Sequence, residues 1–315
     1  MTDLAAPASD LAPAAGDLGR LQGILADLGH VVVAFSGGAD SSFLAKVATD
    51  ALGADKVRCV TAVSPSLAPE ELTDCRSLAS EWGMTHHEVL TDELADPAYA
   101  ANDGSRCYHC KASLMAALIP VVDAAPEGAT VVLGVNLDDL GDHRPGQAAA
   151  AERGARFPLV EAGFTKADVR AWSKHLGLRT WDKPAAACLA SRVPYGTRVT
   201  FTTLDTVARA ESGLRALGFD ELRVRHYGDT ARIEVPDAVL ATVITRRAEV
   251  SAAVHAAGYR YVTLDLDGLR SGNLNDALFD EDRADGDRVD GDRADEDRAV
   301  PPSGIDTNFP TGAHT

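Results

Sequence analysis

An apolar run that leads straight into two glycines is the feature that most constrains this 315-residue chain. Residues 30–35 read His-Val-Val-Val-Ala-Phe, the pattern of a buried strand, and residues 36–41 read Ser-Gly-Gly-Ala-Asp-Ser. Residues 41–52 then show helical spacing. Glycines at such a turn let backbone N–H groups approach an anion, and the helix adds the positive end of its dipole. We therefore expect a phosphate-binding loop, in preference to a plain tight turn.

Strand-like and helix-like segments alternate through residues 18–198. Alternation of this kind predicts an α/β domain with a parallel sheet covered by helices on both faces. The pattern places strands at 30–35, 56–63, 85–90 and 130–135, and helices at 18–29, 41–52, 69–83, 111–125 and 165–176. Residues 178–198 are rich in Pro and Ala, and we expect them to form a functional loop.

A different pattern begins near residue 199 and runs to about residue 272. It predicts a helix over 202–217, an antiparallel hairpin of strands 221–227 and 230–235 turning at Gly228-Asp229, a helix over 238–257 and a strand over 259–264. We expect a small α+β domain with one solvated sheet face, serving substrate binding or oligomerisation. Residues 1–17 and the acidic repeats of 273–315 cannot bury a core, so both are predicted to be disordered.

The formal net charge of −17 argues against nucleic acid as a partner, because that role needs a positive surface. The sequence shows neither a membrane-spanning apolar run nor a secretory leader, so we expect a cytoplasmic protein without membrane contact. Small anionic substrates fit this composition if a local pocket is basic.

Five cysteines, an odd number in a chain of cytosolic character, argue against a disulfide framework. Cys107 and Cys110 form a C-x-x-C, and Cys188 lies between Lys183 and Arg192, cations that favour a reactive thiolate. Ordinary thiols at a helix start are the alternative for the C-x-x-C, and zinc is disfavoured because no fourth ligand is evident. We expect Cys59 and Cys75 to be small buried hydrophobes.

Three segments together resemble the LarE family, ATP-dependent sulfur transferases within the PP-loop ATP pyrophosphatase superfamily. They are the Ser-Gly-Gly-Ala-Asp-Ser loop, Asn136-Leu137-Asp138-Asp139-Leu140-Gly141-Asp142-His143-Arg144-Pro145-Gly146, and residues 183–196. The resemblance covers residues 18–270 and implies the adenine nucleotide α-hydrolase-like fold. It implies that ATP, with Mg²⁺, adenylylates the carboxylates of pyridinium-3,5-dicarboxylate mononucleotide. Sulfur then replaces oxygen, toward the nickel-pincer nucleotide of lactate racemase. A homo-oligomer, up to a hexamer, is also implied.

Candidate site residues follow from these motifs. ATP would contact residues of the loop, of strand 130–135 and of the two later segments: Ser36, Gly37, Gly38, Asp40, Ser41, Ser42, Gly134, Asp139 and Lys183. Asp40 is a candidate ligand of Mg²⁺, and Asp138, Asp139 and Asp142 lie where a sheet edge binds ligands. The mononucleotide would contact Tyr108, Arg144, Arg192, Arg223 and Arg225, and Trp181 could stack on its ring. Family resemblance suggests an anion or metal site on the strand face of Arg223, Arg225, Arg232 and Glu234, built between subunits with Glu211; a solvated sheet face is the alternative.

Two sources of the sulfur stay open. In one branch of the family a cysteine matching Cys188 gives up its own sulfur and becomes dehydroalanine. In the other, cysteines matching Cys107, Cys110 and Cys188 hold a [4Fe–4S] cluster whose free iron carries the sulfide. Because all three cysteines are present, we favour the cluster. A tRNA thiolase and a non-catalytic nucleotide-binding module are the competing functions.

Overall fold

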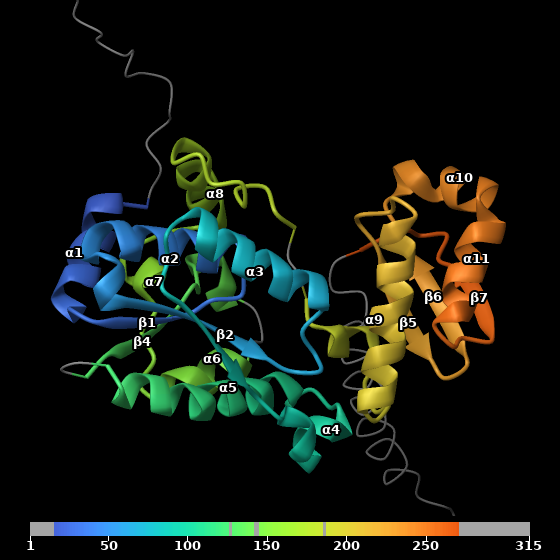
Figure 1. Cartoon of the computed structure of the whole chain (residues 1–315), viewed down its shortest axis with the longest axis horizontal. Helices are drawn as coiled ribbons and strands as arrows, with labels where there is room; N and C mark the ends of the chain where they lie inside the picture. The colour runs from blue at the N-terminus through green and yellow to red at the C-terminus, as the bar shows by residue number, and fades with distance from the viewer. Residues whose placement is uncertain (1–15, 126–127, 142–144, 185–186, 271–315) are drawn as a thin grey trace, which may run out of the picture. The chain divides into compact units, whose positions relative to one another are not determined.

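The computed structural model describes residues 16–125, 128–141, 145–184 and 187–270 (Figure 1). The acidic tail, Asp142, Arg144 and nearly all of the predicted disordered N-terminus lie outside these ranges. In the described ranges no helix combines the length and the apolar composition that crossing a bilayer requires.

A four-stranded parallel sheet forms the centre of the N-terminal region, in the order β3-β2-β1-β4 (Figure 1). Its strands are β1 (Val31–Ala34), β2 (Val57–Val63), β3 (His86–Leu90) and β4 (Thr130–Leu133). Valines dominate β1, and Val31, Val32 and Val33 are all buried, as expected of a strand covered on both faces. The predicted α/β fold with a parallel sheet is confirmed.

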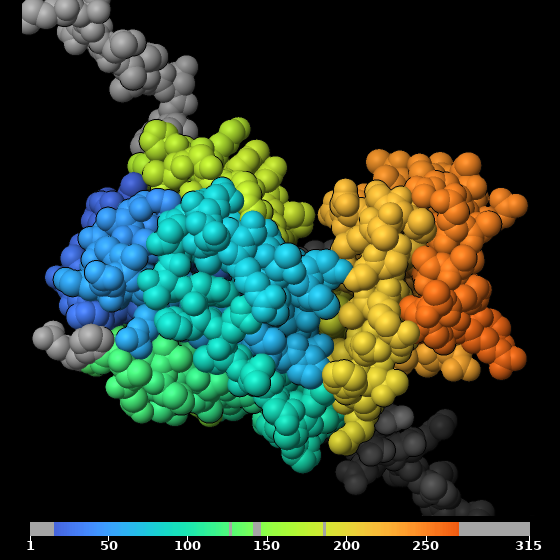
Figure 2. Space-filling view, in the orientation of Figure 1, coloured from blue at the N-terminus to red at the C-terminus, as the bar shows by residue number. Residues whose placement is uncertain are grey.

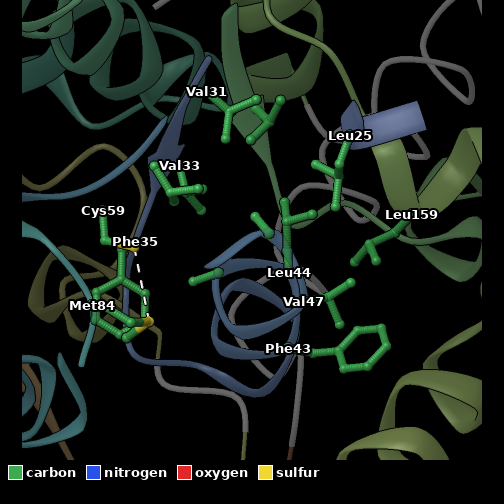
Figure 3. Close-up of a cluster of buried hydrophobic side chains, with 14 of the residues drawn as sticks. Leu25, Val31, Val33, Phe35, Phe43, Leu44, Val47, Cys59, Met84 and Leu159 are labelled. Atoms are coloured by element: carbon green, nitrogen blue, oxygen red, sulfur yellow. Dashed lines mark hydrogen bonds between the residues drawn. The ribbon is translucent and has the colours of Figure 1, made fainter. Parts of the chain in front are cut away.

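Helices cover both faces of this sheet, because successive strand residues point to opposite sides. Val31, Val33 and Phe35 face α1 (Leu18–Leu28) and α2 (Ala39–Leu52), the cluster drawn in Figure 3. The same cluster includes side chains of α3 (Pro69–Glu81), α7 (Pro158–Glu161) and α8 (Lys166–His175). Val32 faces the other way, toward α5 (Arg106–Asp123) and α6 (Pro145–Ala151).

Short elements connect these helices and strands. They are α4 (Pro97–Ala101) and the 3₁₀ turns η1 (Ala54–Lys56), η2 (Glu93–Ala95), η3 (Leu137–Gly141) and η4 (Leu189–Arg192). The turns η3 and η4 carry parts of two of the three motif segments.

The C-terminal region contains a three-stranded sheet in the order β5-β6-β7. The hairpin of β5 (Arg223–Tyr227) and β6 (Thr230–Glu234) is antiparallel, as predicted, and β7 (Tyr261–Leu264) adds in parallel to β6. It packs with α9 (Phe201–Ala216), α10 (Asp237–Thr245) and α11 (Arg247–Ala256). Its buried cluster also takes in Tyr99 and Leu189, so the boundary between residues 198 and 199 stays a prediction.

Two predicted helices differ from the observed ones. The helix expected at 111–125 begins at Arg106, because Asp103 Oδ1 accepts hydrogen bonds from the backbone N and the Oγ of Ser105 and so fixes the turn before it. The helix expected at 238–257 is two helices that meet at Arg246, whose guanidinium reaches the Leu217 carbonyl at the end of α9 (2.8 Å). The earlier start of α5 places Cys107 and Cys110 in its first turns.

Candidate active site

The glycine-serine loop joins β1 to α2 at the carboxyl end of β1. Gly37 has a φ of +69°, and a Cβ there would lie 2.9 Å from the Cys75 Sγ, so only glycine fits without strain. Gly38 is the N-cap of α2, and Ser42 N is bonded to its carbonyl (3.0 Å). Amides that precede Ser42 in the first turn have no intrahelical acceptor, and they carry the positive end of the helix dipole. The loop therefore offers backbone donors to an anion.

Serine hydroxyls hold the shape of this loop. The Ser41 Oγ accepts from the Ser36 backbone N (3.3 Å), lies 3.1 Å from the Ser36 Oγ and donates to the Gly38 carbonyl (3.2 Å). Ser42 is fully buried, and its hydroxyl has no hydrogen-bond partner within the described residues. Ser36 and Ser41 thus belong to the loop, whereas Ser42 faces the interior.

Asp40 stands in the first turn of α2 and connects the loop to the β4 edge. Its Oδ1 accepts from the Asn136 Nδ2 (3.1 Å), and its Oδ2 is paired with the Lys166 ammonium. Gly134 lies where α2 crosses β4: a Cβ there would be 2.7 Å from the Ser41 N and 2.8 Å from the Asp40 C. Gly134 therefore allows the two backbones to meet, and the ammonium of Lys166 already occupies one oxygen of the predicted Mg²⁺ ligand.

The two described aspartates of the second motif shape the turn after β4. Asp139 Oδ2 accepts from the Asn136 backbone N (3.1 Å), and Asp138 Oδ2 accepts from the Lys166 backbone N (2.7 Å). Both follow β4 in η3, at the edge where β1 delivers the loop. Asp138 and Asp139 thus lie at the predicted edge, where they cap turns.

Lys183 reaches the underside of the loop from the third motif. Its Nζ donates to the Gly37 carbonyl (3.2 Å), to Glu71 Oε2 (2.8 Å) and to Asp74 Oδ2 (2.7 Å). Burial raises the pKa of the Asp74 carboxyl, but hydrogen bonds from Lys183 and Arg179 outweigh it and hold that pKa below its usual range. The predicted cation is therefore at the loop, with two carboxylates of α3 as partners.

Three cysteines lie in two segments that pack on each other. Cys107 and Cys188 are exposed and Cys110 is half-buried. The amide of Asn102, just before α5, donates to the Pro194 carbonyl (2.8 Å) and the Thr197 carbonyl (2.9 Å), so the Cys107 segment is fixed to the Cys188 segment. Burial first, and then the nearby Cys188, raise the pKa of the Cys110 thiol to about 12.

The Cys188 segment also reaches the parallel sheet. The backbone N of Leu189 donates to the carbonyl of Ser66, which follows β2 (2.8 Å). Because β1 and β2 are parallel, Cys188 lies on the edge that carries the glycine loop. Cys59 and Cys75 are fully buried, and burial raises their pKa to about 12 and about 11, so the expectation of buried hydrophobes is confirmed.

Comparisons with known proteins agree with these motifs. The pyridinium-3,5-bisthiocarboxylic acid mononucleotide synthase of Lactiplantibacillus plantarum is 42% identical over 255 residues, 81% of this chain and 92% of that protein. An uncharacterised protein of Synechocystis is 46% identical over 263 residues, 83% of this chain and 97% of the relative. The chain belongs to the LarE family of PP-loop proteins. Residues 25–109 also match the NAD synthase family, and a Methanocaldococcus jannaschii protein is 25% identical over 241 residues, 76% of this chain and 91% of its own.

Two of the arginines predicted to bind the substrate are paired with carboxylates. Arg192 is buried and paired with Glu211 (2.8 Å), which is itself fully buried. Arg225 pairs with the equally buried Glu234 (2.8 Å) and donates to the Ser191 carbonyl (2.7 Å). The alternative of a solvated sheet face is therefore wrong for Arg225 and Glu234, because the Cys188 segment covers them.

Neither glutamate is available as a metal ligand in this arrangement. Burial raises the pKa of Glu211, but Arg192 outweighs it and the pKa is lowered. Arg215 also pairs with Glu211 and Arg232 with Glu234. Across the described ranges, no three His, Cys, Asp or Glu side chains come together so as to hold a metal ion. The metal site suggested between subunits at Glu211 and Glu234 stays a prediction.

Both aromatic candidates are engaged away from the thiols. The Tyr108 hydroxyl donates to Glu152 Oε2 on the turn after α6 (2.7 Å), and the Arg153 guanidinium lies over its ring. The Lys174 ammonium lies over the Trp181 ring, 4.6 Å from the ring centroid. A hollow of about 550 Å³ is lined by Glu70, Asp74 and Arg179 among others. The first two belong to α3, which lies on the face shown in Figure 2. Of the residues that line this hollow, only Asp74 also bonds to Lys183 beneath the glycine loop. We therefore place the candidate site at the glycine loop and the cysteines, and not at the hollow.

Sequence reasoning missed Arg106, Tyr99 and Tyr195. Arg106 is buried and donates to the Ala190 carbonyl (2.9 Å), and the Tyr195 ring lies 5.5 Å from its guanidinium carbon. The Tyr99 hydroxyl bonds to the Ser66 hydroxyl beneath the Cys188 segment. Arg106 directly precedes the C-x-x-C, which was the only signal in the sequence.

Proposed function

We propose that this LarE-family protein is an ATP-dependent sulfur transferase acting on pyridinium-3,5-dicarboxylate mononucleotide. ATP, with Mg²⁺, adenylylates a substrate carboxylate, and sulfur then replaces one of its oxygens. Two rounds give the dithio form that the Lactiplantibacillus relative is named for. The observation that carries this proposal is the shared sheet edge, which holds both the glycine loop and the segment of Cys188.

The first step uses the glycine loop. A substrate carboxylate oxygen attacks the α-phosphorus of ATP, the bond between the α and β phosphates breaks, and pyrophosphate leaves. Backbone amides at the start of α2 stabilise the negative charge that grows on the leaving group. Lys183 holds the loop from beneath through the Gly37 carbonyl. We expect Asp40 to coordinate Mg²⁺, either directly once the Lys166 ammonium is displaced or through a bridging water.

The mononucleotide anion fits the arginine cluster of the C-terminal sheet. Burial lowers the pKa of Arg223, and its neighbours Arg225 and Arg192 lower it further, so this guanidinium is destabilised by its own surroundings. A phosphate would relieve that repulsion with charge-assisted hydrogen bonds. We therefore assign Arg223 the strongest interaction with substrate, with Arg225 and Arg192 held beside it by Glu234 and Glu211.

The sulfur is delivered at the three cysteines. Their thiols are soft donors that influence one another electrostatically, and Cys107 and Cys188 are open to solvent, which suits a [4Fe–4S] cluster held by three protein ligands. In the described residues, no three metal-binding side chains lie close enough together to hold a metal ion. We therefore expect the three thiols to move together around iron as the cluster assembles. Cys107, Cys110 and Cys188 would hold the cluster, which when bound carries the sulfide that attacks the acyl carbon as AMP leaves.

Sacrifice of Cys188 is the second route to the same product. Its sulfur would attack the acyl-adenylate, AMP would leave, and removal of the Cα proton would break the Cβ–S bond to give dehydroalanine and the thiocarboxylate. The exposure of Cys188 permits this route as well. We further propose a cytoplasmic homo-oligomer without a nucleic-acid partner, in keeping with the acidic charge of the chain.

The test begins with protein purified without oxygen. Pyrophosphate release should require both ATP and the mononucleotide, and mass spectrometry should find sulfur-for-oxygen exchange in the product. Visible absorbance and iron should be lost in Cys107→Ala, Cys110→Ala and Cys188→Ala but kept in Cys59→Ala, whose thiol is buried on β2. A colourless protein that loses one H₂S at Cys188 would select the sacrificial route. Pyrophosphate release that depends on tRNA and ignores the mononucleotide would reject the proposed function.

A further inference from the structure

Arg106 is a buried cation without an anionic partner among the residues that the structure describes. Its side chain begins α5 and its residue is 5% exposed. The Nη1 donates to the Asn102 Oδ1 (2.5 Å) and the Ala190 carbonyl (2.9 Å), both neutral acceptors. The Tyr195 ring covers one face of the guanidinium.

Other buried arginines of the chain are balanced. Arg192 and Arg225 each face a fully buried glutamate at 2.8 Å. Lys183, the other cation that flanks Cys188 in the sequence, is balanced by Glu71 and Asp74. A buried charge is costly unless it is paired, so the unpaired charge of Arg106 calls for a negative partner that belongs to the working protein.

The surroundings of Arg106 indicate which partner this is. Cys107 follows it directly in the first turn of α5, and Cys188 lies two residues before Ala190, whose carbonyl Arg106 holds. Each of the two segments that Arg106 joins therefore carries a cysteine, and a thiolate or sulfide there would bring the negative charge that this guanidinium lacks.

We propose that Arg106 supplies the fixed positive charge that stabilises the sulfur donor at Cys188 and Cys107. This inference rests on the proposed function, since it names the residue that balances the charge of the transferred sulfur. It applies equally to a thiolate and to a sulfide carried by the three cysteines. As the sulfur attacks the acyl carbon, its negative charge moves to the departing AMP, and Arg106 acts on the donor side of that transfer.

The experiment measures the local charge at Cys188 without ATP or substrate. The metal-free full-length protein is alkylated with iodoacetate, which is anionic, and with iodoacetamide, which is neutral, and the rate at each cysteine is followed by peptide mass spectrometry. The ratio of the two rates cancels the fraction of thiolate, so it reports the field at the sulfur. Loss of one nearby unit charge should lower the ratio at Cys188 about fivefold in Arg106→Gln.

Three comparisons make the result decisive. Arg106→Lys keeps the charge and should keep the ratio within about twofold of the wild type. Arg209→Gln removes an exposed arginine paired with Asp205 on α9 and should leave the ratio unchanged. In the wild type, the ratio at Cys188 should exceed that of N-acetylcysteine amide, a comparison that needs no variant to fold.

Two outcomes overturn the inference: a wild-type ratio no higher than that of the free thiol, or a ratio in Arg106→Gln equal to the wild type. Failure of the proposed function looks different, because the alkylation ratio would still fall while the wild type made no thiocarboxylate. Where the wild type is active, Arg106→Gln should release pyrophosphate at a similar rate but form thiocarboxylate at least tenfold more slowly.

Discussion

Gly134 directly follows β4, where the backbone at the start of α2 passes against it. Its place at the end of β4 suggested contact with ATP, whereas the structure shows the α2 backbone crossing where a Cβ would be. We expect Gly134→Ala to push the start of α2 away and to lower the free energy of unfolding by about 1–3 kcal/mol, as overpacking does. Urea denaturation measures this loss.

Gly23→Ala is the matched control for Gly134→Ala. Gly23 lies in α1 with open space around its Cα, so alanine there should raise stability by about 0.5–1 kcal/mol. Equal effects of the two substitutions would show that the crossing of α2 over β4 is not tight.

Lys183 gives a prediction with a defined pH range. Lys183→Met leaves Glu71 and Asp74 without their cation, and we expect it to cost about 1–3 kcal/mol at pH 7, less than a fully buried pair because the site is partly solvated. Asp74 has a lowered pKa when folded, so its contribution is present above about pH 4, the unfolded value, and is lost as the pH falls through the folded pKa. Lys183 has a raised pKa despite burial, so its contribution is present below about pH 10 and is lost at higher pH.

The difference in stability between wild type and Lys183→Met should therefore be level from about pH 4 to pH 10 and shrink at both ends. Thermal or urea unfolding across this range measures it. Lys46→Met, which breaks an exposed pair with Asp50 in α2, should cost only about 0.3–0.5 kcal/mol. A difference that grew in acid would contradict the assignment of these charges.

Residue-level prediction was possible where a local pattern carries the chemistry. Gly37 and Gly38 could be assigned to an anion loop because strand, glycines and helix adjoin in the sequence. Arg106 could not be assigned, because its partner carbonyl at Ala190 is 84 positions away. The cations that adjoin Cys188 in the sequence, Lys183 and Arg192, proved to be balanced by carboxylates from α3 and α9, which no local pattern reveals.

At the scale of elements, the attachment of the Cys107 segment to the Cys188 segment depends on Asn102. This residue is fully buried, has a φ of +61°, and donates its amide to carbonyls of Val193, Pro194 and Thr197. Asn102→Gly keeps the left-handed backbone without strain, so its cost, about 1–3 kcal/mol, reflects the lost hydrogen bonds of the side-chain amide, including the one that its Oδ1 accepts from Arg106. Asn102→Ala should cost about 1 kcal/mol more, because alanine is disfavoured at positive φ.

Urea denaturation of both Asn102 variants checks that order. If the attachment also serves chemistry, Asn102→Gly should lower thiocarboxylate formation more than pyrophosphate release, because the loop of α2 is untouched. An Asn102→Gly protein as stable as the wild type would show that the two cysteine segments are held by other contacts.

Elements with strong periodicity were predicted well, and their ends were not. The valines of β1 and β4 predicted the parallel sheet, since strands covered on both faces need continuous apolar runs. The start of α5 at Arg106 was missed because the polar cap of Asp103 and Ser105 precedes a stretch without apolar period. For this reason the sequence did not predict that Cys107 and Cys110 lie in the first turns of a helix.

At the scale of the whole molecule, two sheets divide the proposed work. The parallel sheet supplies the loop for the leaving pyrophosphate, and the C-terminal sheet supplies arginines for the substrate anion, with the Cys188 segment bonded to both through Leu189 and Ser191. Within the short turn η4, the Leu189 N–H donates to the Ser66 carbonyl, and the Ser191 carbonyl accepts from Arg225 of β5. The acyl-adenylate must therefore form within reach of that turn.

If the two sheets bind different substrates, a substitution in the C-terminal sheet should weaken binding of the mononucleotide without weakening binding of ATP. Arg223 lies on β5, half-buried, and its charge is destabilised by Arg225 and Arg192, so a bound phosphate gains most from it. Arg223→Gln should raise KM for the mononucleotide about 10–100-fold, the worth of a charge-assisted hydrogen bond of about 1.5–3 kcal/mol, while KM for ATP changes less than about twofold. Steady-state pyrophosphate release with each substrate varied in turn measures both constants, with Arg209→Gln as the control for loss of one surface charge. A parallel rise in KM for ATP would mean that Arg223 serves the nucleotide triphosphate instead, and the assignment of the two sheets to two substrates would then be wrong.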